Sequence, residues 1–285
     1  MIVDAHHHLW RPAEGYGWLD EPALAPIRRD FTPADLARAL TAAGVDRTIL
    51  VEGGRCDTAE AAVLLGHARD VPAIAGVVAW ADLADPDLPG LLAHYRALPG
   101  GDRLVGIRSQ VQAEPDPDYL ARPEAHAGLR AVATAGLVFD LVIRADQLPA
   151  AASAAAAVPQ ALLVLDHLGK PRIRAGSAGH DEWAGPLAAL AAWPNVSAKL
   201  SGLVTEADWA GWTVADLRPF VATAVASFGP RRLMFGSDWP VCLLAAPYPA
   251  VPAALAEALP PLPAGERAEI FGGTATRIYG LDRQR

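Results

Sequence analysis

The sequence predicts an α/β protein that folds as a single-domain (β/α)8 barrel of the TIM type. Short runs of β-branched and leucine residues recur along the chain, helix-like segments rich in alanine and leucine separate them, and polar or aromatic residues follow nearly every run. Strands that alternate with helices pair in parallel, and eight of them close into a barrel. The chain of 285 residues has the length of one such domain, so we expect one domain over residues 1–285.

The expected strands are short and apolar. β-branched side chains favour an extended backbone, and a short apolar run suits a strand that is buried on both faces. The runs are residues 2–3, 48–51, 74–80, 104–108, 137–142, 162–165, 196–200 and 233–235. The alternative is an open doubly wound sheet, which is disfavoured because no glycine-rich phosphate loop of the GxGxxG or GxxxxGK[ST] type follows any run.

The expected helices have recognisable starts and stops. Thr32 and Pro33 cap and begin a helix that Gly44 ends, and Thr58 caps another that runs to about Asp70. Alanine and leucine at helical spacing predict further helices at residues 88–98, 124–135, 146–157, 181–192 and 214–228. Loops are expected in the proline- and glycine-rich stretches at residues 12–26, 86–89, 114–123 and 247–263.

Composition narrows the class of partner. The formal net charge is -8 and no run of lysines or arginines occurs, which disfavours nucleic acids and anionic membranes. The apolar stretches are too short to span a bilayer and no N-terminal targeting pattern is present, so we expect a cytoplasmic protein with a small-molecule substrate. The sequence leaves open whether the protein forms a homo-oligomer. Cys56 and Cys242 lie far apart without a CxxC spacing, which indicates ordinary thiols.

The first expected strand lies within the segment MIVDAHHHLW, at residues 1–10. Side chains alternate along a strand, so His6 and His8 share one face while His7 points the other way. Two imidazoles on one face converge on a point that suits a metal ion or a polarised carbonyl. Asp238 follows the eighth run, and the first and last strands of a barrel are neighbours, so Asp238 can complete the same site. If the histidine pair is considered alone, it is equally compatible with a structural role, in which both histidines lie in the core or a loop and have hydrogen-bond partners.

Chemically active side chains mark the other expected strand ends, where the active sites of barrel enzymes lie. They are Glu52, Trp80, Arg108, Asp140, Asp166, His167, Lys199 and Trp239. We expect Arg108 to bind a substrate carboxylate or hydroxyls, with a structural ion pair as the alternative. Lys199 and Asp140 form either a further substrate contact or a buried ion pair. Trp80 and Trp239, together with Trp10, are candidate flat walls for a sugar ring or else core residues.

Six stretches, in order along the chain, resemble the amidohydrolase superfamily, and within it the amidohydrolase-2 branch of sugar-lactone and pyrone-dicarboxylate lactonases. They are VDAHHHLW at residues 3–10, GIRS at 106–109, LDHLGKP at 165–171, KLSGL at 199–203, MFGSDWPV at 234–241 and IFGGTATRIYGL at 270–281. LDHLGKP, KLSGL and GSDWPV together make the resemblance specific. It implies a (β/α)8 barrel with an active-site core of His6, His8, His167 and Asp238.

The resemblance also bears on metal content. Binuclear members of the superfamily place a carboxylated lysine or a glutamate after strand 4 and a histidine after strand 5, where this chain offers Arg108 and Asp140. At most one divalent ion is therefore implied. We expect Zn²⁺ on His6, His8 and Asp238, with Glu52 or His167 nearby, because imidazole and carboxylate suit zinc. A metal-independent lactonase is the alternative.

The implied reaction is hydrolysis of a sugar-acid lactone in carbohydrate catabolism. Asp238 is the candidate base for water attack, and His167 would polarise the carbonyl or protonate the departing alkoxide, helped by His6 and His8 or an ion that they bind. Because Arg108 is the only arginine at a strand end, a neutral deoxy-sugar lactone such as L-fucono- or L-rhamnono-lactone is favoured over a pyrone dicarboxylate.

Three other functions are compatible with parts of the sequence. A metal-dependent decarboxylase of an aromatic or unsaturated acid on the same barrel remains the main rival. A non-catalytic barrel that binds sugar acids leaves the convergence of a base with carbonyl activators unexplained. Serine catalysis is set aside because no GxSxG motif occurs.

Overall fold

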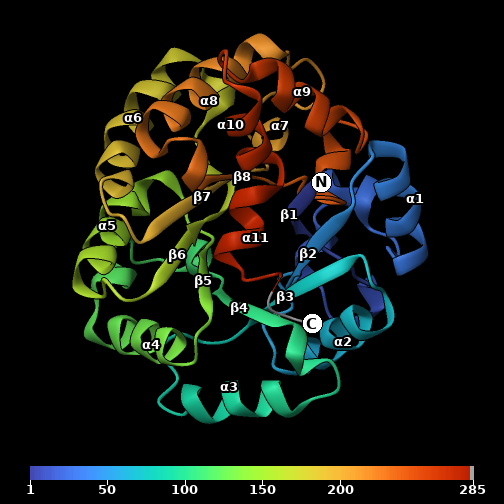
Figure 1. Ribbon diagram of the computed structural model, residues 1–285, viewed down its shortest axis with the longest axis vertical. Coiled ribbons are helices and arrows are strands. Elements are labelled where there is room, and N and C mark those ends of the chain that lie inside the picture. Colours follow the sequence, from blue (N-terminus) through green and yellow to red (C-terminus); the bar gives the residue numbers. More distant parts are fainter. Residues whose placement is uncertain (283–285) are drawn as a thin grey trace.

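Eight parallel strands form a barrel in the computed structural model, which describes residues 1–282. The strands follow one another around the ring in sequence order (Figure 1). They are β1 (Val3–His7), β2 (Arg47–Val51), β3 (Ile74–Trp80), β4 (Leu104–Ser109), β5 (Val138–Leu141), β6 (Leu162–Leu165), β7 (Val196–Leu200) and β8 (Leu233–Phe235). The prediction of a (β/α)8 barrel is confirmed, and most strand bounds agree with the sequence within two residues.

The ring closes between β1 and β8 by contacts beyond the end of the short strand β8. The amide of Asp238 donates to the carbonyl of His6 at 2.8 Å, and the amide of His8 donates to the carbonyl of Trp239 at 2.7 Å. The segment that carries Asp238 therefore continues the sheet alongside β1. This closure brings the two ends of the barrel sequence to one point, as the neighbouring positions of the first and last strands require.

The helices form an outer layer around the strands (Figure 1). They are α1 (Pro33–Ala43), α2 (Ala59–Asp70), α3 (Leu88–Ala97), α4 (Pro123–Thr134), α5 (Leu148–Ala157), α6 (Ser177–Ala191), α7 (Leu203–Glu206), α8 (Val214–Phe228), α9 (Ala250–Ala258), α10 (Ala264–Ala268) and α11 (Thr274–Ile278). Apolar faces of these helices pack on the strands in one large core. In the part of the chain described, no helix has both the length and the apolar character needed to cross a membrane.

Helix ends test the sequence expectations directly. Thr32 and Asp35 form a capping box at the start of α1, and Gly44 ends the helix in the left-handed conformation, as predicted. The predicted cap of α2 is wrong. Thr58 has helical backbone angles and makes no capping hydrogen bond with its side chain. Asp57 caps the helix instead, because its Oδ1 accepts from the amides of residues 59 and 60 at 2.9 and 3.1 Å.

The stretch at residues 247–263 was predicted to be a loop, but it contains the helix α9. Proline ends the stretch on both sides, while the alanine- and leucine-rich centre forms helix and buries Val251 and Leu255. Proline is tolerated near a helix start because the first turn needs no amide donors, which explains Pro252 in this helix. The prolines near both ends of the stretch therefore led to the prediction of a loop where the centre forms a short helix.

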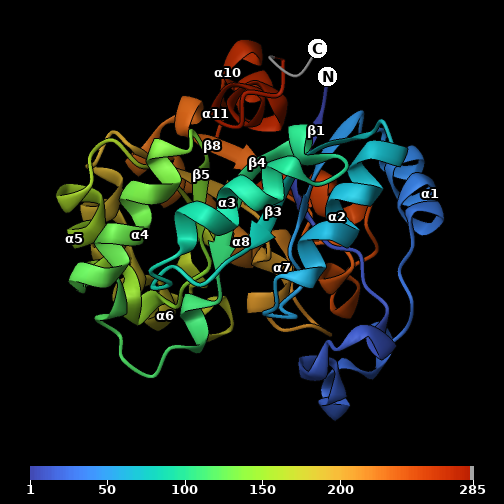
Figure 2. The same cartoon turned by 90° about the horizontal axis from the view of Figure 1, so that it is seen from below.

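The two ends of the barrel differ. At one end, the interior of the barrel is filled by small and β-branched side chains, including Val3, Val51 and Val164. Tyr279 and Leu281 of the C-terminal segment pack onto these side chains. Figure 1 shows α11 lying across the middle of the strand ring at this end. In Figure 2 the segment between β1 and α1 projects from the opposite end, away from α10 and α11. The carboxyl ends of the strands are thus left free to form a site.

Candidate active site

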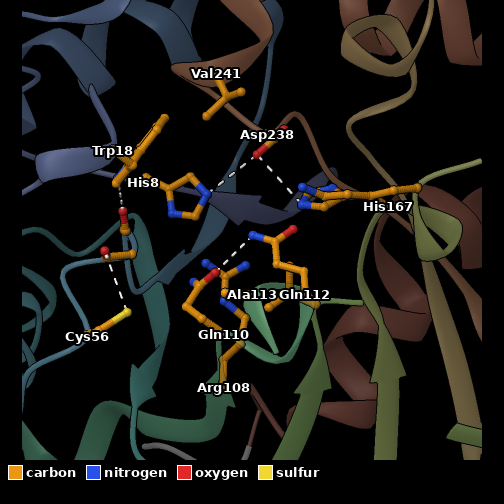
Figure 3. Close-up of a pocket in the computed structure, with 14 residues that line it drawn as sticks. His8, Trp18, Cys56, Arg108, Gln110, Gln112, Ala113, His167, Asp238 and Val241 are labelled. Carbon is orange, nitrogen blue, oxygen red and sulfur yellow. Dashed lines mark hydrogen bonds and ion pairs between the residues drawn. The ribbon is translucent and has the colours of Figure 1, made fainter. Parts of the chain in front are cut away.

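A cavity of about 370 Å³ opens at the carboxyl ends of the strands. Side chains from several strand ends and the loops after them converge on it (Figure 3). The polar and aromatic lining includes His8, Trp18, Arg108, Gln112, His167 and Asp238. Its volume falls in the range of small-molecule sites, about 300–1,000 Å³.

The pair His6 and His8 meets Asp238 in this cavity. The two Nε2 atoms lie 3.2 Å apart. Oδ1 of Asp238 lies 3.4 Å from Nε2 of His8 and 3.8 Å from Nε2 of His6. His7 points away and packs against the ring of Trp239 at 6.5 Å between centroids. Strand alternation thus separates the middle histidine from its neighbours, as predicted.

These three residues fit one divalent ion. Tetrahedral zinc with bonds of about 2.0–2.1 Å places its ligand atoms roughly 3.3 Å apart, close to the separations of the two nitrogens and the carboxylate oxygen. Nδ1 of His8 lies 2.9 Å from the carbonyl of Val51, and Nδ1 of His6 lies 3.3 Å from Oδ1 of Asp166. The Nδ1–H of His8 can therefore donate outward, which leaves its Nε2 lone pair free for a metal. Nε2 of His6 also lies 3.3 Å from a terminal nitrogen of Arg108.

A second carboxylate holds the strand ends that carry these ligands. Asp4 on β1 accepts from the amide of Ser237 at 2.8 Å, from the Ser237 hydroxyl at 2.5 Å and from the hydroxyl of Tyr248 at 2.6 Å. Asp238 follows directly with φ of 57°, a left-handed conformation that is uncommon for a residue other than glycine. Asp4 thus ties β1 to the turn that aims Asp238 at His6 and His8.

His167 reaches the same cavity from a left-handed turn after β6. Residues 167–170 all have positive φ, between 52° and 71°, which is costly for side chains with a Cβ. The buried indole of Trp183 donates to the carbonyl of Leu168 at 2.7 Å and holds the turn. Nδ1 of His167 lies 2.9 Å from Oγ of Ser201, and its Nε2 faces Oδ1 of Asp238 at 4.0 Å. The strained backbone therefore serves to present the imidazole to the cavity.

Burial sets the protonation states. It lowers the pKa of His167 to about 4, so the imidazole is neutral near pH 7. Burial opposes ionisation of Asp238, but the surrounding histidines, His167 foremost, outweigh it and hold the carboxyl pKa well below its usual range. The site therefore combines the ionised carboxylate of Asp238 with the neutral imidazole of His167. This is the state in which both residue types can bind a metal.

Arg108 lies at the floor of the cavity, where acidic partners engage it. Its Nε donates to Oε1 of Glu52 at 2.5 Å, one terminal nitrogen donates to Asp166 at 2.9 Å, and the other donates to the Glu52 carbonyl at 2.6 Å. Oε2 of Glu52 accepts from the amide of Gly54 at 2.7 Å. Glu52 is thus occupied by protein donors, and Arg108 presents only part of its guanidinium to the cavity.

Lys199 and Asp140 lie deeper, under the cavity. Both side chains have no exposed surface, and Nζ of Lys199 is 2.5 Å from Asp140 and 2.9 Å from Asp166. The hydroxyl of Tyr279 donates to the other oxygen of Asp140 at 2.7 Å. Within residues 1–282, neither Lys199 nor Asp140 lines the cavity. Of the two alternatives that the sequence allows, a buried ion pair and a substrate contact, the structure shows the ion pair.

Of the three candidate tryptophans, Trp10 and Trp239 occupy core positions, which was one of the two alternatives expected from the sequence. Trp239 is buried against Phe31, and Trp10 stacks on the imidazole of His8 at 6.1 Å. Trp80 and Trp239 are absent from the lining that the described residues form, whereas Trp18 belongs to it (Figure 3). The Trp18 indole donates to the carbonyl of Gly53 at 2.8 Å, which fixes the ring at the cavity wall.

Sequence reasoning missed several lining residues. Gln110, Gln112 and Lys170 all line the cavity, as does Trp18. Gln110 and Gln112 follow β4 directly, and Lys170 follows the aspartate-histidine pair after β6. The rule that loops after barrel strands carry function could have included them. Trp18 lies in the long segment between β1 and α1, and nothing in its sequence neighbourhood points to the cavity.

The chain is similar to known proteins over nearly its whole length. The sequence model of the Amidohydrolase family matches residues 3–281. An L-fucono-1,5-lactonase of Burkholderia multivorans is 39% identical over 292 residues, covering 99% of this chain and 96% of that protein. An L-fucono-1,5-lactonase of Burkholderia ambifaria is 35% identical, with the same coverage of 99% and 96%.

A solved structure is also similar over its whole length. It is a crystal structure of an amidohydrolase from Burkholderia multivorans with bound zinc. The TM-score is 0.90 at 38% identity, and the match covers 99% of each chain.

Proposed function

The chain belongs to the amidohydrolase family, and from this premise we propose that it is a lactonase that opens a neutral deoxy-sugar lactone, with L-fucono-1,5-lactone as the first candidate. One observation carries the proposal. Asp238, His6 and His8 converge within 3.8 Å of one another beside His167, at the mouth of a barrel that is similar over its whole length to two L-fucono-1,5-lactonases.

A single divalent ion, which we propose to be Zn²⁺, would be held by His6, His8 and Asp238. When bound, it would supply positive charge that polarises the lactone carbonyl and stabilises the developing oxyanion. The outward hydrogen bond of Nδ1 of His8 supports this assignment, because it keeps Nε2 of that ring unprotonated. The zinc in the similar Burkholderia multivorans structure supports it further.

The chain's own residues divide the remaining chemistry. Asp238 offers a second carboxylate oxygen, which we propose takes a proton from the attacking water. His167 is neutral and its Nε2 faces Asp238 at 4.0 Å, so it can receive that proton and pass it to the departing ring oxygen. Opening the ring leaves a carboxylic acid and a hydroxyl on one product, so no further reactant is needed.

The cavity suits a neutral ring with hydroxyls. Arg108 is already paired with Glu52 and Asp166, so its positive charge is largely balanced before a substrate binds. The lining also carries the side-chain amide of Gln112 and the ammonium group of Lys170, which match hydroxyl groups, and Trp18 offers a flat face for a sugar ring. A pyrone dicarboxylate would need more unpaired cations than this lining offers.

The test is hydrolysis of a panel of lactones, followed with a pH indicator and corrected for spontaneous opening. The panel contains L- and D-aldonolactones, a pyrone dicarboxylate and an aromatic carboxylic acid. We expect acid release from L-fucono-1,5-lactone that falls by about two to four orders of magnitude in Asp238→Asn. The matched control is Asp208→Asn, since Asp208 is exposed and lies outside the cavity lining.

The same panel separates the rival function. A decarboxylase would leave every lactone intact and release CO₂ from the aromatic acid. That outcome would overturn the proposal, as would full lactonase activity in Asp238→Asn.

A further inference from the structure

A chain of hydrogen bonds leads from the floor of the cavity to its wall. Nε2 of Gln110 donates to Oε1 of Glu52 at 2.5 Å. Nε2 of Gln112 then donates to Oε1 of Gln110 at 2.9 Å. Glu52 itself is held by the guanidinium of Arg108, which donates to the same Oε1. Two glutamine side chains are thus linked in series to a fixed ion pair.

The chemistry of this chain determines the orientation of both amides. A carboxylate oxygen only accepts hydrogen bonds, so Gln110 must turn its NH₂ group toward Glu52. Its carbonyl oxygen then faces Gln112, which must also turn its NH₂ group toward that oxygen. The reversed orientation of either amide would bring two acceptor oxygens together. The ion pair of Arg108 with Glu52 therefore sets the orientation of Gln112 two links away.

The backbone of Gln112 is also fixed. Its amide donates to the carbonyl of Val142 at 2.9 Å, and its carbonyl accepts from the guanidinium of Arg144. The side chain of Gln147 donates to the carbonyl of Val111 at 2.9 Å, in the turn that carries Gln112. Gln112 is thus a rigid amide on a braced turn, and little conformational freedom remains to be lost when it binds a partner.

The oxygen of this amide is not engaged by any residue that the structure describes. Oε1 of Gln112 makes no hydrogen bond within residues 1–282, although Gln112 is half-buried and lines the cavity with His8, His167 and Asp238. In Figure 3 the amide nitrogen of Gln112 faces Gln110, and the oxygen is turned away from Gln110 toward the side where His167 lies. The chain of hydrogen bonds therefore ends in an oriented acceptor that has no partner in the described part of the protein.

We propose that Oε1 of Gln112 is a specificity-determining acceptor that binds one ring hydroxyl of the lactone substrate. This inference rests on the proposed lactonase function and extends it, because it names the group that selects a hydroxylated ring. A carbonyl oxygen can accept a hydrogen bond from a hydroxyl, whereas it repels a carboxylate and gains nothing from a C–H group. Lactones with a hydroxyl at that ring position are therefore selected over those with hydrogen, fluorine or a carboxylate there.

The test compares wild type and Gln112→Met on L-fucono-1,5-lactone and on analogues in which each ring hydroxyl is replaced in turn by hydrogen or fluorine. Methionine keeps the length of the side chain and removes the acceptor. We expect kcat/KM of Gln112→Met on the parent lactone to fall by roughly tenfold, the value of one neutral hydrogen bond. Wild type should lose a similar factor on the analogue that lacks one hydroxyl, and Gln112→Met should lose nothing further on it.

The control variant is Gln147→Met, which weakens the same turn without facing the cavity. We expect it to change kcat/KM on all analogues by one common factor. The inference is overturned if Gln112→Met behaves in the same way, or if it leaves the parent lactone unaffected while wild type is active. A wild-type protein that is inactive on every lactone would overturn the proposed function, and the inference with it.

Discussion

Nζ of Lys199 and Oδ2 of Asp140 lie 2.5 Å apart, and neither side chain has any exposed surface. Asp166 lies 2.9 Å from the same ammonium group and also pairs with Arg108, so the ion pair belongs to a buried network beneath the histidines. Burial raises the pKa of Asp140 to about 6, although Lys199 opposes the shift. A cation at this place is therefore what keeps the buried carboxylates ionised.

The first prediction concerns the stability of this network. Lys199→Met removes the ammonium and leaves buried carboxylates without their partner, which typically costs about 3–5 kcal/mol. We expect the free energy of unfolding, measured with urea at pH 8, to fall by that amount. Near pH 5 the loss should be smaller, because protonation of Asp140 relieves the uncompensated charge. The exposed pair Arg218 and Glu257 provides the control, since Arg218→Ala should cost less than about 1 kcal/mol. Equal effects of the two variants would contradict the prediction.

The second prediction concerns His167. His167→Asn keeps a polar side chain but removes the imidazole that faces Asp238. We expect kcat on the lactone substrate to fall by about two to four orders of magnitude while KM changes little, because proton transfer is lost and binding groups remain. Steady-state kinetics of the variant checks this, with His94→Asn on the exposed face of α3 as the control. A change confined to KM would show that His167 serves binding instead.

The third prediction concerns metal content. Three ligand atoms within 3.8 Å of one another and the outward Nδ1 hydrogen bond of His8 favour a single ion, so metal analysis should find about one Zn²⁺ per chain. Dialysis against a chelator should abolish turnover, and added Zn²⁺ should restore it. His8→Asn should reduce the bound metal, which can be measured without any activity assay. Undiminished turnover of metal-free protein would exclude an essential ion.

The barrel was predictable from the sequence because its evidence is local. Each apolar run is short and separated by a helix with alanine and leucine at helical spacing, and periodicity of this kind needs no knowledge of distant contacts. Strand alternation likewise predicts that His6 and His8 share a face. Asp57 shows the limit of such reasoning. It replaces the neighbouring Thr58 as the cap of α2, because backbone angles at the turn decide which side chain reaches the free amides.

The cavity wall was less predictable because it is assembled from loops. Trp18 enters from a segment that leaves the barrel between β1 and α1, and its position depends on a hydrogen bond to Gly53, 35 residues away. Gln112 follows a strand, but its role depends on the orientation that Glu52 imposes through Gln110. Neither relationship leaves a periodic signal in the sequence. The residue types at strand ends identify candidate site residues. Only tertiary contacts show which of them line the cavity wall, which lie at its floor and which hold other side chains in place.

The fourth prediction begins from Glu60, a buried carboxyl group near the cavity. Its Oε1 accepts from the hydroxyl of Tyr16 at 2.9 Å and from the amide of Gly53 at 2.8 Å. Its Oε2 is buried and has no hydrogen-bond partner in the described part of the chain. Burial, together with the nearby charge of Glu52, raises the pKa of Glu60 from 4.5 to about 7. The protonated form therefore fits this place better than the ionised form.

A raised carboxyl pKa has a definite consequence for stability. Between pH 4.5 and about 7 the folded state holds a proton on Glu60 that the unfolded state has lost. The folded state binds more protons in this window, so the contribution of Glu60 to stability falls as pH rises through it and is constant above. At 1.36 kcal/mol for each pKa unit, the fall amounts to at most about 3 kcal/mol.

Glu60→Gln isolates this effect, because glutamine keeps an oxygen that can accept from Tyr16 and Gly53 but does not ionise. We expect the variant and wild type to have similar free energies of unfolding near pH 5, and the variant to become more stable by up to about 3 kcal/mol at pH 8. Urea unfolding of both proteins across this range checks the difference, with Glu21→Gln, at an exposed position, as the control. Parallel pH profiles for wild type and Glu60→Gln would show that Glu60 ionises alike in the folded and unfolded states.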